Sequence, residues 1–298
     1  MTDRTEAVPR SLPAPRPHAI RRVRRAVRVP LKHCLLALCA LTMLYPVLWM
    51  AVSSLRPNSQ IFRSAGLALA HPHFENYTNG WNAFSQPFSH YMINSAIVVT
   101  GAILGNLLAC SLAAYAFARL EFKAKRVWFA IMLVTIMLPI HVIIVPQYVL
   151  YSELGWVNTF LPLIVPKFLA TDAFFIFLMV QFIRGIPREI DEAARIDGAG
   201  HARIFFSLIL PLMVPALATT AIFTFIWTWN DFYTQLIYLT DPDMYTTPLA
   251  LRTFVDQQTA TDWGSVFAMS VVSLVPVFLV FLAGQRFLLR GIATTGGK

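Results

Sequence analysis

Charged residues are scarce in this sequence. Asp, Glu, Lys and Arg together make up 13% of its 298 residues, whereas about 25% is usual for a soluble domain. Hydrophobic residues reach 57%, so the folded chain would expose too much apolar surface in water, and the lipid bilayer is the expected solvent. In that setting the formal net charge of +9 does not indicate a nucleic-acid partner, and the positions of the charges matter more than their sum.

Cysteine is also rare, and its three positions exclude a disulfide framework. Cys34, Cys39 and Cys110 all lie in apolar runs, and no CxxC pair occurs. We expect all three to be small buried hydrophobic residues. His71 and His73 lie close together, but no further ligand cluster accompanies them, so no metal site is predicted.

Motifs for nucleotide binding and catalysis are absent as well. No GxxxxGK[ST] phosphate loop occurs, and the one Gly-Gly-Lys is the chain end at 296–298. No nucleophile–base or metal constellation assembles, so no catalytic residue is predicted and an intramembrane enzyme is disfavoured. A proton-coupled secondary transporter remains an alternative, although internal repeats and intramembrane acids of the kind such proteins show are not evident.

Long apolar runs are what the sequence has in quantity. A membrane-crossing helix needs about 20 mostly apolar residues. Six runs qualify, at 33–53, 91–118, 127–148, 160–182, 205–229 and 263–285. They predict an all-α, polytopic membrane protein with one six-span domain over 33–290, an Arg/Pro-rich tail over 1–32 and a C-terminal tail over 291–298.

The distribution of Lys and Arg predicts the orientation of these spans. Twenty of these residues lie in the N-terminal tail, the 2–3 and 4–5 loops and the C-terminal end, and three lie in the opposite loops. Because cytoplasmic loops carry the excess of positive charge, both termini and the 4–5 loop at 184–204 are expected in the cytoplasm. Such a protein would be a multi-pass component of the cell membrane.

Prolines and glycines predict two local features of the spans. Pro139 and Pro146 bracket "PIHVIIVP" in the third span, where each removes a backbone donor. The result is either a bent helix lining a pathway or an ordinary kink at the outer end. Gly101 and Gly105 form a GxxxG pair in the second span, which favours close packing against another helix.

The cytoplasmic 4–5 loop contains a segment with the signals of a short helix. Pro187 suits the first helical position, and Glu189, Asp191 and Glu192 lie at the positive end of the helix dipole. Gly198 is placed to end the helix in a left-handed conformation. The spacing also allows Arg195 to pair with Asp191 or Glu192 on the exposed side.

One face of this predicted helix carries small residues. Ile190, Ala193, Ala194 and Asp197 follow helical spacing, and the alanines remove bulk without disturbing the helix. A partner surface could approach closely there, as in helix-in-groove recognition. The alternative is a surface helix that rests on its own span ends.

The spacing around this helix resembles a known signature. "EAA" at 192–194 is followed after three residues by Gly198, and after nine more by "LILP" at 208–211. This resembles the EAA motif of ABC importer permeases, with Leu208 where the family usually has Ile. Similarity to the maltose-type sugar permeases, and within them to the smaller six-span partner, extends over nearly all residues after about 33, including "RPNSQIF", "AYAFARLEF", "LGWVNT", "FTFIWTWNDF" and "QRFLLRGI".

The resemblance implies a set of partners. Such a permease is half of a heterodimeric pore with a second permease subunit, below which two copies of a cytoplasmic ATPase bind ATP and magnesium. An extracytoplasmic solute-binding protein would deliver a sugar, while this chain holds no cofactor, contacts membrane lipid and binds no nucleic acid. An importer of another polar solute, such as a phosphorylated glycerol, is the alternative. The residues implied in coupling to the ATPase are Asp191, Glu192, Ala193, Ala194, Arg195 and Gly198.

Four polar residues inside or near the spans are candidates for the substrate path. Lys167 and Asp172 lie in the fourth span, five residues apart, and so do not stack on one helical face. The favoured interpretation is that Lys167 reaches the outer surface and Asp172 faces a helix contact. The alternative is a cavity-facing pair whose side chains contact sugar hydroxyls or each other. Asn94 and Asn230 either bind the sugar or cap span ends, and capping is favoured.

Overall fold

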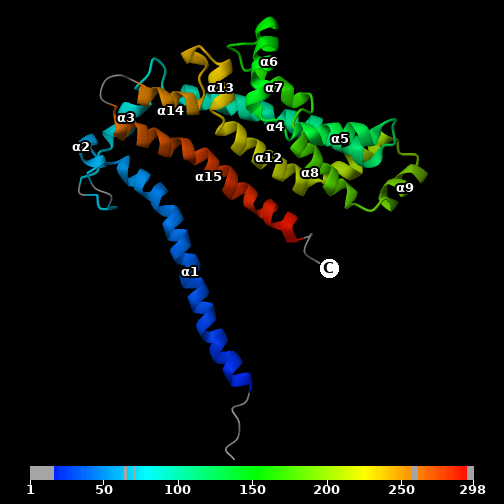
Figure 1. The fold of residues 1–298 in the computed structure, drawn as a ribbon, viewed down its shortest axis with the longest axis horizontal. Helices are drawn as coiled ribbons and strands as arrows, with labels where there is room; N and C mark the ends of the chain where they lie inside the picture. Colours follow the sequence, from blue (N-terminus) through cyan, green and yellow to red (C-terminus); the bar gives the residue numbers. More distant parts are fainter. Residues whose placement is uncertain (1–16, 64–65, 70, 257–260, 294–298) are drawn as a thin grey trace, which may run out of the picture.

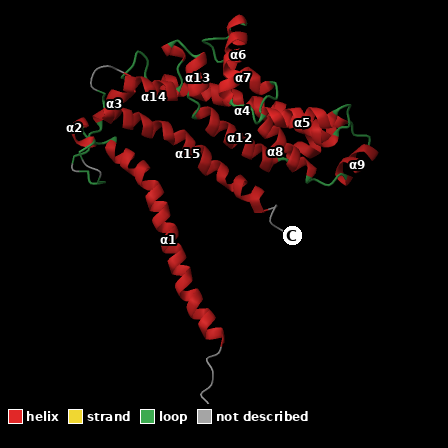
Figure 2. Cartoon of the chain, viewed as in Figure 1, coloured by secondary structure: helices red, strands yellow, loops and turns green. Residues whose placement is uncertain are grey.

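The protein is built from helices. The computed structural model describes residues 17–63, 66–69, 71–256 and 261–293, and within them no strand occurs (Figure 2). The all-α prediction is therefore confirmed. The elements are α1 (Pro17–Ser53), α2 (Asn58–Ile61), α3 (Glu75–Trp81), α4 (Phe88–Arg119), α5 (Lys125–Thr135), α6 (Ile140–Glu153), α7 (Leu161–Phe168), α8 (Ala173–Arg184), α9 (Glu189–Ile196), α10 (His201–Ile204), η1 (Phe205–Ile209), α11 (Leu210–Leu212), α12 (Val214–Trp229), α13 (Tyr233–Tyr238), η2 (Pro242–Met244), α14 (Thr247–Asp256) and α15 (Trp263–Ala293).

Four segments are long and apolar enough to cross a membrane. They are Lys32–Ser53, Phe88–Arg119, Leu161–Arg184 and Trp263–Arg286. Two further pairs of helices qualify only if each bent pair is one span. The first is α5 with α6, bent by 101°, and the second is the segment His201–Leu212, which contains α10, η1 and α11, with α12, bent by 74°. The described chain thus has four to six candidate spans, and the number six stays a prediction.

The bends lie where proline changes the backbone. Pro139 precedes α6, at the 101° turn that follows α5, whereas Pro146 lies inside α6 without ending it. Of the two prolines in "PIHVIIVP", only the first therefore breaks the helix. Pro211 follows the π-helical turn Phe205–Ile209, as expected where a missing N–H disturbs the regular ladder of hydrogen bonds.

Helix α4 is the centre of the molecule. It packs against α7, α8 and α12, and α12 in turn packs against α15 (Figure 1). A Cβ atom added at Gly101 would lie 2.8 Å from Ile164 Cγ2, and one added at Gly105 would lie 2.9 Å from the backbone carbon of Lys167. The close packing predicted from the GxxxG pair is confirmed, and the partner is α7.

Helix α1 stands away from this body. Its apolar segment has no buried residue in its most hydrophobic window, and Figure 1 shows it reaching α15 at its C-terminal part alone. There Trp49 meets Phe267 edge to face, with ring centroids 5.5 Å apart. The expectation that all three cysteines are buried is wrong for Cys34 and Cys39, which are exposed because α1 has no neighbour there; Cys110 on α4 is buried.

The start of α15 is held by a carboxylate. Asp262 precedes the helix, and its Oδ2 accepts a hydrogen bond from Ser265 Oγ (2.6 Å), while its Oδ1 accepts one from Asn58 Nδ2 (2.7 Å). Partial burial alone would raise the pKa of Asp262. The hydrogen bonds from Ser265, Asn58 and the nearby backbone outweigh burial, so the pKa lies below its ordinary value of 3.8.

Replacing Asp262 with alanine should lower the stability of the N-terminal end of α15 by about 1 kcal/mol, the usual contribution of a capping side chain. Because the folded-state pKa is depressed, this stabilisation is present above pH 3.8 and is lost as the pH falls below that value. The melting temperature of the purified protein, followed by tryptophan fluorescence, measures the effect. The difference in melting temperature between the native chain and Asp262→Ala should become smaller as the pH is lowered. A difference that grows toward low pH contradicts the capping role of Asp262.

Candidate functional site

Helix α9 is the short helix predicted in the 4–5 loop. It spans Glu189–Ile196 at the end of the molecule beyond α8 (Figure 1). Its first residue lies two positions after Pro187, the predicted start. Gly198 follows with φ +78°, and a Cβ added there would meet nothing within 4 Å. The left-handed conformation predicted for Gly198 is confirmed, and its requirement for glycine comes from the backbone and not from crowding.

The surface of α9 divides differently from the predicted face of small residues. Ala194 is buried with Ile183 and Ile204, while Ala193 next to it is exposed. Ile196, which sequence reasoning did not single out, is 87% exposed. The open side of the helix therefore carries Glu192, Ala193, Arg195 and this isoleucine, a mixed surface with one large apolar side chain.

Asp191 faces the body of the protein. It is 5% exposed, and its Oδ2 lies 2.7 Å from Nε of Arg119, the last residue of α4. Arg119 also donates a hydrogen bond from Nη2 to the backbone oxygen of Ile186, at 2.7 Å. The predicted partner Arg195 is thus replaced by Arg119, because the acid lies on the inward face of α9. No local spacing rule could reveal a contact between such distant positions.

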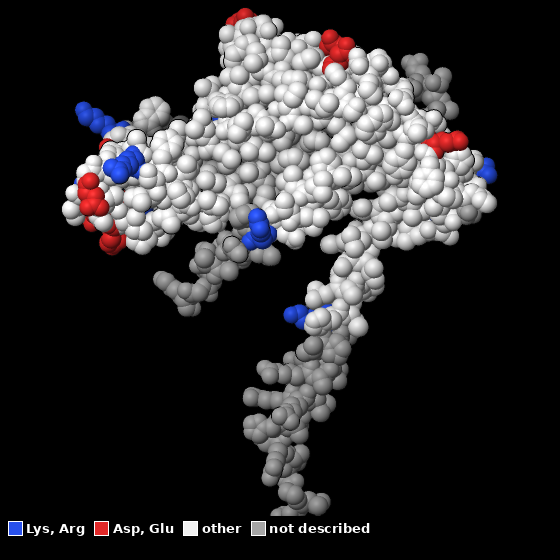
Figure 3. Space-filling view, turned by 180° about the vertical axis from the view of Figure 1, so that it is seen from behind, with Lys and Arg blue, Asp and Glu red and all other residues white. Residues whose placement is uncertain are grey.

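A cleft of about 470 Å³ opens between α9 and the end of α4. Figure 3 shows that charges gather at this end of the molecule, while the broad surface next to it carries almost none. The cleft has both signs of charge on its walls, so it fits a polar protein surface better than a single anion or cation. Its walls are formed by Arg119, Leu120, Glu121, Arg188, Asp191, Glu192, Arg195 and His201.

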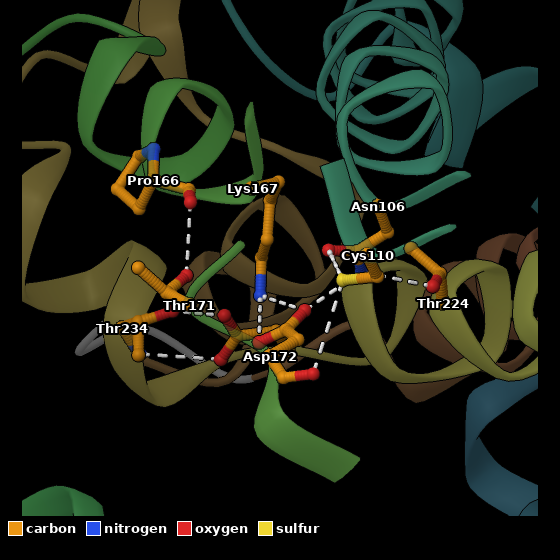
Figure 4. A network of polar contacts seen from close by, with 9 residues as sticks. Asn106, Cys110, Pro166, Lys167, Thr171, Asp172, Thr224 and Thr234 are labelled. Carbon is orange, nitrogen blue, oxygen red and sulfur yellow. Dashed lines mark hydrogen bonds and ion pairs between the residues drawn. The ribbon is translucent and has the colours of Figure 1, made fainter. Parts of the chain in front are cut away.

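A second polar cluster lies deep between the helices. Lys167 Nζ lies 2.9 Å from Asp172 Oδ2 and 3.0 Å from Oδ1 (Figure 4). The chain leaves helical geometry between α7 and α8, with φ +56° at Ala170, and this break lets the two side chains meet. A contact between the two side chains belongs to the alternative prediction, whereas the favoured one, in which Lys167 reaches the outer surface, missed it because it assumed one continuous helix.

The ion pair is anchored to two more helices. Asn106 on α4 donates from Nδ2 to Asp172 Oδ2 (2.7 Å) and contacts Thr224 Oγ1 on α12 (3.1 Å). Cys110 Sγ lies 3.8 Å from Asn106 Oδ1. About a quarter of each charged side chain stays accessible, 28% for Lys167 and 25% for Asp172. Sequence reasoning missed Asn106 and Thr224, although an asparagine inside an apolar run was a signal for the first of them.

Asn94 and Asn230 lie apart from this cluster. Asn94 Nδ2 donates to the backbone oxygens of Asp243 (3.0 Å) and Tyr245 (2.9 Å), which ties α4 to the segment between α13 and α14. Asn230 Nδ2 donates to Ile226 O in its own helix, at 2.8 Å. Both amides bind backbone oxygens, Asn230 at the end of α12 and Asn94 inside α4, where it joins the helix to a loop and does not cap a span end. Among the residues that the structure describes, no group of three or more His, Cys, Asp or Glu side chains is placed to hold a metal ion.

Comparison with known proteins identifies the family. Residues 105–293 match the family model "Binding-protein-dependent transport system inner membrane component". The chain is 35% identical over 254 residues to the probable ABC transporter permease protein YurM of Bacillus subtilis, covering 85% of this chain and 83% of that one. It is 34% identical over 257 residues to the diacetylchitobiose uptake system permease protein NgcG of Streptomyces coelicolor, covering 86% and 84%.

Two further comparisons bear on substrate and fold. The chain is 30% identical over 266 residues to the sn-glycerol-3-phosphate transport system permease protein UgpE of Yersinia pestis, covering 87% and 94%. Its fold is similar to a chain in the crystal structure of a bacterial ABC transporter involved in the import of the acidic polysaccharide alginate, with TM-score 0.75, 22% identity and coverage of 93% and 99%. This chain belongs to the family of binding-protein-dependent transport system inner membrane components, and it is a membrane-spanning permease subunit of an ABC importer.

Proposed function

We propose that this chain forms half of the path by which an importer takes up a sugar or oligosaccharide, and that α9 couples the path to a separate ATPase. The observation that carries the coupling role is the 87% exposure of Ile196 on a charged helix at one end of the molecule. A single exposed apolar residue is ordinary on a protein surface, but this one lies on a helix whose charged side chains line a cleft of about 470 Å³, and the combination favours a site that another protein covers. The EAA spacing around it supports the same role.

The membrane setting follows from this role. We propose six spans across the cell membrane with both termini in the cytoplasm, because 20 of the 24 Lys and Arg residues belong to the two tails and the loops that this orientation assigns to the cytoplasmic side. The expected partners are a second permease subunit, two ATPase subunits that bind ATP and magnesium, and an extracytoplasmic solute-binding protein. This subunit is then non-catalytic, and the free energy of ATP reaches it through differential contacts of the ATPase with two conformations of the permease.

A sugar is the proposed cargo because relatives such as NgcG and the arabinooligosaccharides transport system permease protein AraQ are named for sugar uptake. The similarity to UgpE supports glycerol phosphate as the second candidate. Inside the path, the accessible quarter of Lys167 and Asp172 is the proposed solute contact. Asn94 and Asn230 are weaker candidates, since their amides already bind backbone oxygens.

Replacing Ile196 with aspartate should release the ATPase. Burying an isoleucine against a partner contributes about 1.5–3 kcal/mol, so its loss should weaken binding roughly tenfold to a hundredfold. The measurement is the amount of ATPase that copurifies with the tagged permease in gentle detergent. Lys123→Glu is the matched control, because it also changes the charge of an exposed residue on this side of the molecule.

Two outcomes would contradict the proposal. Full recovery of the ATPase with Ile196→Asp removes α9 as the docking element, and purification of the native complex with no ATPase at all removes the whole function. The cargo is tested separately, by screening the copurified solute-binding protein against oligosaccharides and glycerol phosphates by calorimetry. Binding of a glycerol phosphate and of no oligosaccharide would replace the sugar assignment with the second candidate.

A further inference from the structure

The buried ion pair between Arg119 and Asp191 does more than fill space. Its side chains are 3% and 7% exposed, and removing two charges from water offsets most of their attraction. The pair is also incompletely satisfied, because neither Asp191 Oδ1 nor Arg119 Nε makes a hydrogen bond with any of the described residues, and the 2.7 Å contact of Nε with Asp191 Oδ2 is a contact between charges. Two apolar side chains would fill the same space at a smaller loss of solvation. The pair therefore contributes little net stability, and what it supplies is a defined position for α9.

One guanidinium group holds α9 at two points. Nε of Arg119 contacts the carboxylate of Asp191 within the helix, and Nη2 binds the oxygen of Ile186 in the segment that leads into it, both at 2.7 Å. The hydrogen bond from Nη2 fixes direction as well as distance, and the contact of Nε with the carboxylate adds attraction between opposite charges at 2.7 Å. Helix α9 is thus locked in orientation against the last residue of α4.

The other connections of α9 are weak. The helix contributes Ala194 to the buried core, and its remaining apolar residues are half-buried or exposed. Gly198 follows it with φ +78°, and glycine gives the backbone freedom to turn at this end. The contact on its C-terminal side, Tyr115 Oη to His201 Nδ1, is longer at 3.4 Å. Without Arg119, α9 could therefore change its orientation while the other helices kept their positions.

The place of attachment determines what moves with α9. Arg119 is the last residue of α4, and α4 packs against α7, α8 and α12. It also carries Asn106, which reaches the Lys167–Asp172 pair in the middle of the molecule. A displacement of α9 that moves Arg119 therefore also moves α4, the helix that contacts α7, α8 and α12. Rigid elements joined by a stiff contact carry displacement between discrete arrangements.

We propose that Arg119 is a positioning residue for import, which ties α9 to α4 so that movement of the ATPase reaches the translocation path through α4. This inference rests on the proposed docking of the ATPase at α9. It predicts that α9 and α4 move together in the intact protein and separately when the tie is removed.

The test uses the assembled transporter with its native cysteines replaced. Spin labels at Glu189→Cys on α9 and at Lys123→Cys beyond α4 are each paired with a label at Gln285→Cys on α15, all at exposed positions. Distances are measured by double electron–electron resonance without nucleotide and with a non-hydrolysable ATP analogue and magnesium. The variant combines Arg119→Met with Asp191→Leu, so that no buried charge is left alone. Arg119→Lys is the conservative comparison, because lysine keeps the charge without the two-partner fork.

In the native chain, both distances should shift when nucleotide binds. In the double variant the Glu189–Gln285 distance should still shift, whereas the Lys123–Gln285 shift should fall several-fold. Arg119→Lys should give an intermediate shift of the Lys123–Gln285 distance. If the double variant does not fold, the shift in Arg119→Lys alone tests the inference. A Lys123–Gln285 shift of native size in these variants overturns the inference alone. A native complex in which Glu189 does not move overturns the proposed function, and this inference with it.

Discussion

Replacing Asp172 with leucine should prevent the subunit from accumulating in the membrane. The change leaves Lys167 charged and without its carboxylate partner between the helices, and it removes the acceptor of Asn106. Breaking a buried ion pair by deleting one partner costs about 3–5 kcal/mol, and the lower end applies because a quarter of each side chain is accessible. The measurements are the yield of the subunit in membranes and the melting temperature of the purified complex.

The double variant Lys167→Met with Asp172→Leu is the control for this prediction. It removes both charges together and should recover most of the yield, because a pair of apolar side chains replaces an ion pair at little net loss. Its transport then reports on the path itself, since a folded subunit with normal ATP hydrolysis and reduced uptake supports a contact with the solute. Equal accumulation of Asp172→Leu and the native chain would contradict the structural importance of the pair.

Replacing Gly198 with valine should reduce uptake about tenfold while the complex still assembles, because roughly 1–2 kcal/mol of backbone strain at the end of α9 is enough to shift its orientation. Gly198 has φ +78° with no atom within 4 Å of an added Cβ, so the effect is one of backbone conformation and not of crowding. Gly198→Asp should have the same direction with a smaller effect, since aspartate tolerates the left-handed region better. Uptake of the solute identified with the binding protein is the measurement.

Gly155 provides a matched control for this substitution. It has φ +68° and equally open surroundings, but it lies after α6, far along the chain from α9. Gly155→Val should therefore strain the backbone to the same degree and leave the ratio of uptake to ATP hydrolysis unchanged. Equal loss of coupling in both variants would mean that general destabilisation, and not the position of α9, causes the effect.

Much of the fold was predictable because its signals are local. Apolar runs predict helices in a bilayer regardless of what they pack against, and the helix signals around α9 lie within twelve residues of one another. Gly198 is the clearest example, since a helix end of this type needs a left-handed residue. The GxxxG pair worked for a similar reason, because a missing side chain at Gly101 and Gly105 has a direct steric meaning.

The contacts between distant helices were not predictable in the same way. Arg119 and Asp191 meet because the end of α4 folds against α9, and nothing in the spacing of either segment indicates this contact. The break at 169–172 was missed because "LATD" contains no glycine or proline. If the helix continues through this segment, Lys167 and Asp172 point in different directions. The assumption of a continuous helix therefore disfavoured a contact that the structure contains.

The exposed helix α1 has a consequence for how this sequence can change over time. No residue in its most apolar window is buried by the rest of the chain, so exchanges among leucine, isoleucine, valine and phenylalanine there keep its hydropathy and disturb no internal neighbour. Along α4 the reverse holds, because Gly101, Gly105 and Asn106 each meet a specific atom of another helix. Selection on this chain alone therefore lets α1 drift in sequence as a membrane anchor, while it preserves the buried positions of α4 such as Gly105 and Asn106.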